Sequence, residues 1–175
     1  GRRIPLRRFA AAAVIVVALA AAFMTYRVAT APFVHRFHNA DTVAMHVAMP
    51  DGTDVWLSPG TTPSYDDTFR VDGRNVELDG EAYFDVEHDA EHPFIVHSCR
   101  QSVRVLGTTF NVQAYSNESE NTVTLLSGAV GLDLLDREGE LLRSLELHPY
   151  EQCHFDKRAG SYRLSELDAL SLIHI

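Results

Sequence analysis

The sequence lacks the short motifs that mark the common enzyme and nucleotide-binding classes. It has no Gly-x-Gly-x-x-Gly or Walker-type loop for a phosphate and no Gly-x-Ser-x-Gly elbow around a nucleophile. It also has no His-x-His pair, which a cupin-type metal site would need in its strands. These absences argue against nucleotide binding, serine-hydrolase chemistry and cupin chemistry. We therefore predict no catalytic residue, no metal ligand and no cofactor.

Cysteine is scarce as well, with only Cys99 and Cys153 in the chain. Neither lies in a spacing motif that is typical of a metal or redox site. In an oxidising compartment the two thiols could pair, but their separation alone does not establish a bridge. The sequence leaves the disulfide open.

Basic residues are few outside the N-terminal end. The 175 residues carry 15 Lys and Arg against 24 Asp and Glu, a net charge of −9. Residues 1–27 contain five arginines and no acid, so the charge divides into +5 there and −14 over 28–175. Because phosphate binding needs a basic surface, we predict no nucleic-acid partner.

A run without charge extends from Phe9 to Tyr26. As a helix with a rise of about 1.5 Å per residue it would measure roughly 27 Å, close to the ~30 Å of a bilayer's hydrocarbon core. We predict a transmembrane helix over 9–27, with the arginine-rich flank 1–8 in the cytoplasm and residues 28–175 outside. A signal peptide cleaved near Ala29-Thr30-Ala31 and a buried core helix are the alternatives.

Beyond a juxtamembrane linker over 28–41, the apolar residues alternate with a period of two, and turn signals separate the runs. This pattern predicts an all-β domain over 42–160, built from short antiparallel strands as a sandwich or barrel, or coiled as a solenoid. The strands are expected at 43–49, 53–57, 69–71, 75–78, 81–86, 94–97, 102–106, 109–115, 122–126 and 129–134, with shorter candidates at 141–147, 152–155 and 161–164.

The alternation also nominates a core. Residues that share a strand face with apolar neighbours are expected to be buried. They are Ala82, Phe84, Val86, Phe110, Val112, Ala114, Val130, Leu132 and Leu134.

Two clusters carry side chains that could do chemistry. His88 and His92 are four residues apart, a zinc-ligand spacing on a helix, and His97 follows. Pro93 disfavours a helix there, so we interpret 85–92 as a solvated acidic loop. The acids Glu77, Asp79, Glu81 and Asp85 alternate along two strands joined by Asp79-Gly80, and a glycosidase-like carboxylate pair is the alternative to a plain solvent face.

Five phrases in the same order carry a family resemblance. They are residues 49–57 (MPDGTDVWL), 77–86 (ELDGEAYFDV), 92–96 (HPFIV), 105–112 (VLGTTFNV) and 126–130 (LSGAV). Together they resemble the FecR-type anti-sigma factors over about residues 43–158.

The resemblance implies a single-pass protein of the bacterial inner membrane whose larger part is periplasmic. Its implied partners are an extracytoplasmic-function sigma factor, the signalling domain of a TonB-dependent outer-membrane transporter, and the lipid bilayer. It implies signal transduction rather than enzyme activity. The alternatives are an anchored β-rich binding module for an envelope polysaccharide and, third, an envelope hydrolase.

Both ends of the sequence are expected to be incomplete relative to that family. The flank 1–8 is interpreted as the remnant of a sigma-binding region. Residues 161–175 are interpreted as the start of a further region, and Ser165-Glu166-Leu167-Asp168 resembles a capping box that opens a helix. We also hypothesise that partner binding is transmitted to the membrane helix by exposing the linker to a protease or shielding it from one.

Overall fold

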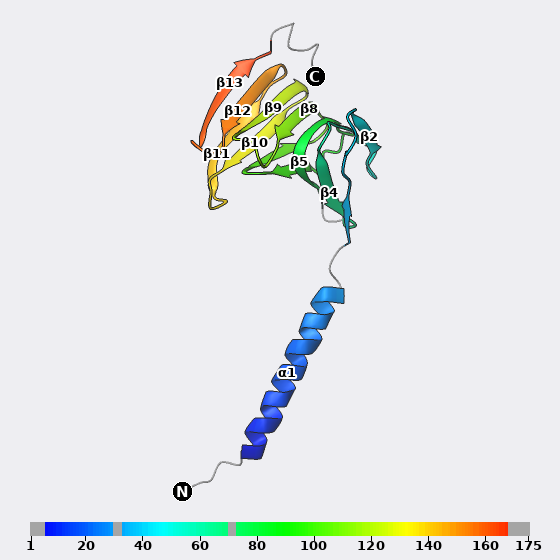
Figure 1. The fold of residues 1–175 in the computed structure, drawn as a ribbon, viewed down its shortest axis with the longest axis vertical. Coiled ribbons are helices and arrows are strands. Elements are labelled where there is room, and N and C mark those ends of the chain that lie inside the picture. Colours follow the sequence, from blue (N-terminus) through cyan, green and yellow to red (C-terminus); the bar gives the residue numbers. More distant parts are fainter. Residues whose placement is uncertain (1–5, 30–32, 70–72, 168–175) are drawn as a thin grey trace. The chain divides into compact units, whose positions relative to one another are not determined.

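The computed structural model describes residues 6–29, 33–69 and 73–167, with the side chains of 15–26 in the first range. The chain forms two compact units, residues 1–33 and residues 34–175. Among the described residues, the first contains one helix and the second contains strands and no helix (Figure 1).

The helix α1 extends over Leu6–Ala29. Its described side chains, 15–26, are all exposed. No helix in the described part of the chain is long and apolar enough to cross a membrane. The predicted span over 9–27 includes residues whose side chains lie outside the described set, and it stays a prediction.

The second unit confirms the predicted all-β class. The described residues form thirteen strands. They are β1 (Val34–Arg36), β2 (Met45–Ala48), β3 (Asp54–Leu57), β4 (Thr62–Asp66), β5 (Arg74–Asp85), β6 (Phe94–Ser98), β7 (Gln101–Val105), β8 (Thr109–Ala114), β9 (Glu120–Ser127), β10 (Val130–Leu135), β11 (Leu141–Leu147), β12 (Glu151–Asp156) and β13 (Ser161–Glu166).

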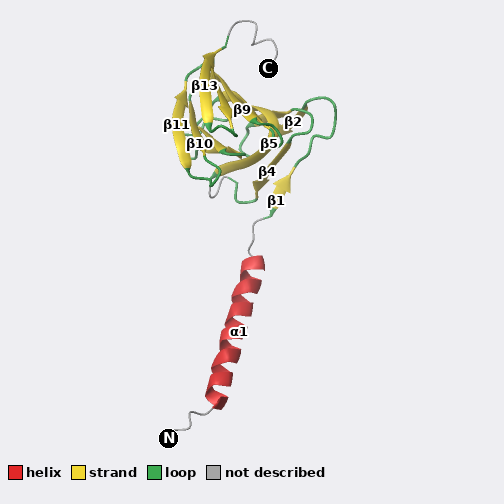
Figure 2. Cartoon of the chain, turned by 60° about the vertical axis from the view of Figure 1, so that its left-hand side comes forward, coloured by secondary structure: helices red, strands yellow, loops and turns green. Residues whose placement is uncertain are grey.

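The strands form one continuous, curled sheet whose two halves face each other across the core (Figure 2). One half, sheet A, has the order β11-β10-β7-β6-β5-β4-β1, and the other, sheet B, has the order β2-β3-β5-β8-β9-β12-β13. All pairings are antiparallel except that of β5 with β6. Of the architectures that the sequence left open, the structure is the sandwich-like one rather than a solenoid.

Strand β5 belongs to both halves. Its first part, Arg74–Asp79, pairs with β6 and β4, and its second part, Gly80–Asp85, pairs with β3 and β8. The sequence predicts two strands and a turn at Asp79-Gly80, and this prediction was wrong. The backbone instead continues through Gly80 with φ +129°, and a Cβ there would lie 2.7 Å from the Cα of Thr61. Glycine thus lets one strand pass from sheet A to sheet B.

The core between the halves confirms the sequence prediction, because all nine nominated residues are buried. Aromatic rings form an unbroken series of contacts that leads from β1 into this core. His35 stacks on Tyr65 at 5.2 Å between ring centroids, and Tyr65 contacts Phe69 at 5.1 Å. The series continues through Phe94 and Phe84 to Phe110, which stacks on Phe84 at 5.0 Å. It connects β1 with the centre of sheet B.

The predicted linker over 28–41 is shorter in the structure. Val34–Arg36 is paired with β4, because the chain's backbone groups find partners there. Asn39 extends this attachment, with a side chain that is 1% exposed. It donates hydrogen bonds to the carbonyls of Leu57 (2.8 Å) and Val43 (2.9 Å). Residues from 34 onward therefore belong to the β domain.

The prediction of a capping box at 165–168 was also wrong for the residues of this segment that the structure describes. Ser165 and Glu166 lie in β13, opposite Gln152 and Glu151 of β12. Pairing with a neighbouring strand outweighs the local helix signal, since a helix of so few residues is marginal alone. Asp168 and the rest of the predicted helix lie outside the described residues.

Candidate binding site

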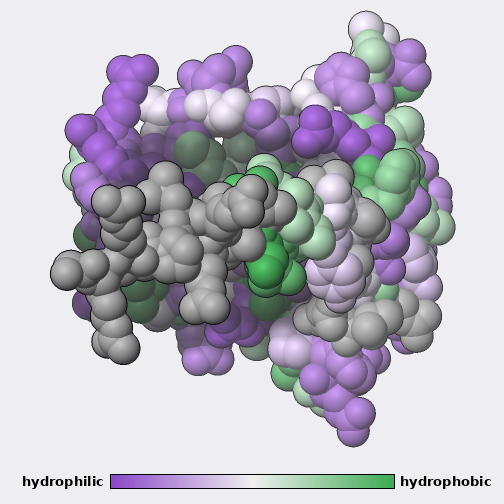
Figure 3. Space-filling view, turned by 90° about the horizontal axis from the view of Figure 1, so that it is seen from below, coloured by the Kyte–Doolittle hydropathy of each residue, from purple (hydrophilic) through white to green (hydrophobic). Residues whose placement is uncertain are grey.

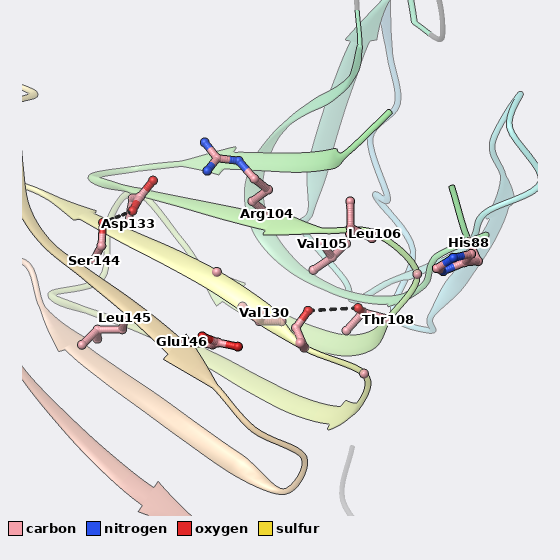
Figure 4. A pocket seen from close by; sticks show the side chains of 14 residues that line it. His88, Arg104, Val105, Leu106, Thr108, Val130, Asp133, Ser144, Leu145 and Glu146 are labelled. Carbon is pink, nitrogen blue, oxygen red and sulfur yellow. Dashed lines mark hydrogen bonds between the residues drawn. The ribbon is translucent and has the colours of Figure 1, made fainter. Parts of the chain in front are cut away.

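A hollow lies on the outer face of sheet A. It has a volume of about 820 Å³ and runs across β7, β10 and β11. Figure 4 shows Arg104 of β7 and Glu146 of β11 on either side of β10. We call this hollow the Gly131 groove, with Arg104, Gly131, Asp133, Ser144 and Glu146 as its defining residues.

The groove exists because the middle strand has no side chain at its centre. Gly131 is the direct partner of Arg104 on one side and of Glu146 on the other. A Cβ added at Gly131 would have no atom nearer than 3.7 Å, so the space above it is open. The neighbouring row, Ser102, Asp133 and Ser144, continues the groove with polar groups.

Opposite charges lie along the two sides of the groove. Arg104 and Glu146 are both exposed, and the Ser144 hydroxyl donates a hydrogen bond to Asp133. Leu106 adds an apolar side chain that is 42% exposed. This combination suits non-covalent binding of a polar segment with an apolar contact. Figure 3, which views the chain from below, shows hydrophilic residues gathered along the edges of that view.

His88 closes one end of the groove. Its ring and backbone lie against Gly107, where an added Cβ would come within 2.5 Å of His88 Nδ1 and 2.7 Å of its Cα. Thr108 donates its hydroxyl to the carbonyl of Ala129 at 3.1 Å and ties the two turns at this end together. Any side chain at position 107 would push the His88 loop away.

A buried arginine holds the same loop in place. Arg74 is 2% exposed and forms an ion pair with Asp51 at 3.0 Å. Its guanidinium also donates to the carbonyls of Glu87 (2.7 Å) and His92 (2.8 Å). One side chain at the start of β5 thus fixes both the 50–52 turn and the 86–92 loop.

The predicted histidine cluster is not brought together as a ligand set. Residues 86–93 contain no helix, as the sequence predicts. His88 packs on Gly107, whereas His92 bonds through Nδ1 to Asp89 at 3.0 Å and His97 contacts Asn75 at 3.3 Å. No group of three His, Cys, Asp or Glu side chains that could hold a metal occurs among the described residues.

Within this loop, Asp89 is the residue whose pKa is clearly shifted. Its carboxylate accepts a hydrogen bond from His92, and the backbone N–H groups of Glu91 and His92 donate to it as well. These bonds favour the ionised form and lower the pKa of Asp89 to about 2. The Asp89 carboxylate therefore stabilises the local conformation of this loop.

The alternating acids of β5 lie on the solvent side, as expected, but in two sheets. Glu77 and Asp79 project from sheet A, and Glu81 and Asp85 project from sheet B. Asp79 binds the backbone N–H of Ser116 at 2.8 Å, and Glu81 accepts from Asn111 at 3.1 Å. Their hydrogen bonds give these acids structural roles.

Both cysteines are free in the structure, so the possible bridge is not formed. Cys99 is exposed in the turn between β6 and β7, while Cys153 is 1% exposed in the core. Burial raises the pKa of the Cys153 thiol to about 11.

Sequence reasoning missed Gly131 and Arg74. The first had a usable signal, since an isolated glycine within an alternating strand often marks a hollow or a close approach. The second had none, because its partners lie 13, 18 and 23 positions away.

Comparison with known proteins places this fold in a family. The family model described as FecR protein matches residues 36–131. A crystal structure of an anti-sigma factor candidate from Parabacteroides distasonis ATCC 8503 at 2.50 Å resolution is similar, with 32% identity and a TM-score of 0.72. The alignment covers 81% of this chain and 63% of that one.

A second structure from the same organism, of an anti-sigma factor candidate at 1.65 Å resolution, gives 32% identity and a TM-score of 0.71. It covers 79% of this chain and again 63% of that one, so the chain spans less than two thirds of both structures. No curated protein matches the chain. The matched residues extend from the last residue of β1 to the start of β10 and thus include the groove's floor at Gly131. By the family model and by these structures, the chain belongs to the FecR protein family.

Proposed function

We propose that this chain is the signal-transducing part of an anti-sigma factor that holds an extracytoplasmic-function sigma factor inactive until a signal arrives. The observation that carries the proposal is the FecR match over 36–131, together with two similar structures that are themselves of anti-sigma factor candidates. The chain spans only 63% of those structures, so the activity and partners of the whole protein are part of the proposal.

The proposed location is the inner membrane, with the β domain in the periplasm. The uncharged run 9–26 and the arginines before it support this location. In this arrangement a cytoplasmic N-terminal region binds the sigma factor. The signalling domain of a TonB-dependent outer-membrane transporter supplies the signal from outside.

The β domain would connect these two events. The Gly131 groove offers a binding surface with opposite charges on its two sides. Strand β1, the first described segment of the domain, is attached to the core through the ring contacts from His35 to Phe110. A change in how β1 pairs with β4 would therefore alter the chain that leads toward the helix, and it would expose residues 34–41 to a protease.

The test is a transcription reporter in cells that express the complete protein. The reporter promoter is one that the co-encoded extracytoplasmic-function sigma factor recognises. Deleting the gene should change reporter activity, and the sigma factor should co-purify with the complete protein from solubilised membranes. Unchanged reporter activity and no co-purified sigma factor would contradict the proposal.

A groove variant separates signal reception from sigma-factor binding. Gly131→Leu fills the open space above β10, whereas Thr122→Leu places the same side chain on the outer face of sheet B as a control. We expect Gly131→Leu to abolish the response to the transported substrate while the sigma factor still co-purifies. An equal loss with Thr122→Leu would show that the groove has no special role.

A further inference from the structure

An exposed row of aromatic side chains crosses the outer face of sheet B. His46 of β2 lies opposite Trp56 of β3, and Trp56 lies opposite Tyr83 of β5. The ring centroids of His46 and Trp56 are 5.0 Å apart, and those of Trp56 and Tyr83 are 5.4 Å apart in an edge-on arrangement. Trp56, the only tryptophan in the chain, is 37% exposed. The Trp56 ring therefore lies at the surface, although the residues on the opposite face of β3 are packed in the apolar core.

Acids surround this row on both sides. Asp54 and Asp85 are direct cross-strand partners on the same face, next to Trp56 and Tyr83. Two like charges in that relationship repel each other and destabilise the pair of strands. On the far side of Tyr83, Glu81 projects from the same face. We call His46, Asp54, Trp56, Glu81, Tyr83 and Asp85 the Trp56 patch.

No lysine or arginine in these strands compensates the acids. Strands β2, β3, β8, β9 and β12 and the Gly80–Asp85 part of β5 contain no lysine or arginine. The Asp54 carboxylate bonds to His46 at 2.7 Å, and Asp85 accepts from the Thr109 hydroxyl at 3.0 Å. Neither bond adds a permanent positive charge, so no fixed cation in these strands offsets the repulsion between the two carboxylates.

A cation bound above the rings would contact the aromatic faces and also offset the repulsion between the opposed carboxylates. The faces of tryptophan and tyrosine attract cations, and arginine stacks on them while its N–H groups bind carboxylates. Burial, with a further contribution from the negative charge of Asp85, raises the pKa of Tyr83, so its hydroxyl stays protonated near neutral pH and remains a donor or acceptor. A neutral sugar could stack on the rings as well, but it would leave the opposed carboxylates without a counter-charge.

We propose that the Trp56 patch is a docking site for an arginine side chain of a partner protein, held over Trp56 and Tyr83 between Asp54, Asp85 and Glu81. The site lies on sheet B, whereas the Gly131 groove lies on sheet A. The observations that support the site are independent of the groove. It does not depend on the identity of the sigma factor or the transporter.

The single tryptophan supplies the measurement. The purified chain is titrated with a 12-residue Gly-Ser peptide that carries four arginines and has blocked ends, and Trp56 fluorescence is followed. A peptide with citrulline in place of arginine is the matched probe without charge. We expect a saturable change with the arginine peptide that weakens as salt increases, and none with the citrulline peptide.

Two charge variants locate the contact. Asp85→Asn should weaken arginine-peptide binding by about 2- to 5-fold, the range that an exposed ion pair supplies. Glu138→Gln removes the same charge from an exposed position in the turn between β10 and β11, outside the Trp56 patch and the Gly131 groove, and should leave the affinity unchanged. An equal loss in both variants, or no saturable change in fluorescence, would overturn the proposal.

The carbohydrate alternative is tested in the same way. Chitohexaose, a neutral oligosaccharide, is added in place of the peptide. A saturable, salt-independent change in Trp56 fluorescence with chitohexaose, and none with the arginine peptide, would also overturn the proposal and identify a sugar platform instead.

Discussion

Arg74 and Asp51 form an ion pair at 3.0 Å in which both side chains are almost completely buried, at 2% and 4% exposure. The pair joins the Pro50-Asp51-Gly52 turn to the beginning of β5, and Arg74 also holds the 86–92 loop through its carbonyl contacts. Since His88 of that loop closes the Gly131 groove, the pair stabilises one wall of the candidate site.

Replacing the arginine should therefore be costly. Arg74→Leu leaves a buried carboxylate and two loop carbonyls without their donor, and we expect a loss of about 3–5 kcal/mol in the free energy of unfolding. Urea denaturation at pH 7 measures it. Arg104→Leu, at an exposed position on sheet A, is the control and should change stability by no more than about 0.5 kcal/mol. Similar losses in the two variants would contradict this role.

Replacing the glycine should reduce the stability of the fold at position 80 but not at position 131. Gly80→Ala places a Cβ 2.5–2.8 Å from atoms of Thr61 at a φ of +129°, so we expect a loss of at least about 2 kcal/mol. Gly131→Ala meets no atom nearer than 3.7 Å, and its stability should stay within about 1 kcal/mol of the parent. Thermal unfolding of both variants checks the contrast. Equal effects would show that β5 does not depend on the glycine at its crossing.

Asp89 should titrate well below an ordinary aspartate. With the His92 bond and the two backbone bonds in place, the pKa is expected near 2, against an ordinary value of 3.8. The lowered pKa contributes stability that is present above about pH 4 and is lost as the pH falls toward 2. Carboxyl-carbon NMR measures the titration. In His92→Ala the pKa should rise toward 3.8, and an unchanged value would assign the shift to the backbone donors alone.

The two cysteines should differ sharply in reactivity. Cys99 is exposed, while burial raises the pKa of Cys153 to about 11 from an ordinary 9.0. At pH 8 in the native state, iodoacetamide should modify Cys99 and spare Cys153, as peptide mass mapping will show. Because the pKa of Cys153 is raised on folding, its contribution to stability is complete below about pH 9 and is lost as the pH rises through 11. Labelling of both thiols at equal rates would contradict the burial of Cys153.

Attachment of the first strand should depend on Asn39. Asn39→Ala removes donors to two carbonyls, one of them fully buried, and we expect a loss of about 1–3 kcal/mol. Limited trypsin digestion should then cleave faster after Arg36, which lies in β1. Asn121→Ala, which removes a bond to Cys99 in another part of the fold, is the control for general destabilisation. Faster cleavage after Arg36 in both variants would show that Asn39 has no specific hold on β1.

The local pattern of the sequence predicted most of the fold. Phe110, Val112 and Ala114 were assigned to the core from a period of two, which depends only on neighbours along the chain. Strand β4 was missed because Pro63 and its polar neighbours read as a loop, yet residues 62–64 pair with Asp79, Leu78 and Glu77. The crossing at Gly80 was taken for a hairpin because Asp-Gly is a common turn dipeptide.

The candidate site was much harder to predict than the fold. The groove needs β7, β10 and β11 to be neighbours, and strand order is a long-range property that no local pattern contains. Likewise, Asp54 and Asp85 are 31 positions apart, and only the pairing of β3 with β5 makes them direct neighbours. The family phrases carried information about the overall class of protein but not about these contacts.

The sharing of β5 between both halves has a consequence for how the domain opens. Each end of this strand is enclosed by two neighbours, so neither half can separate at β5 without breaking ladders on both sides. Amide protons of β5 should consequently exchange with solvent only on global unfolding, while those of the outermost strands β1, β2, β11 and β13 exchange through local fraying. If a ligand that does not contact β1 slows amide exchange in β1, it must therefore do so by stabilising the whole domain.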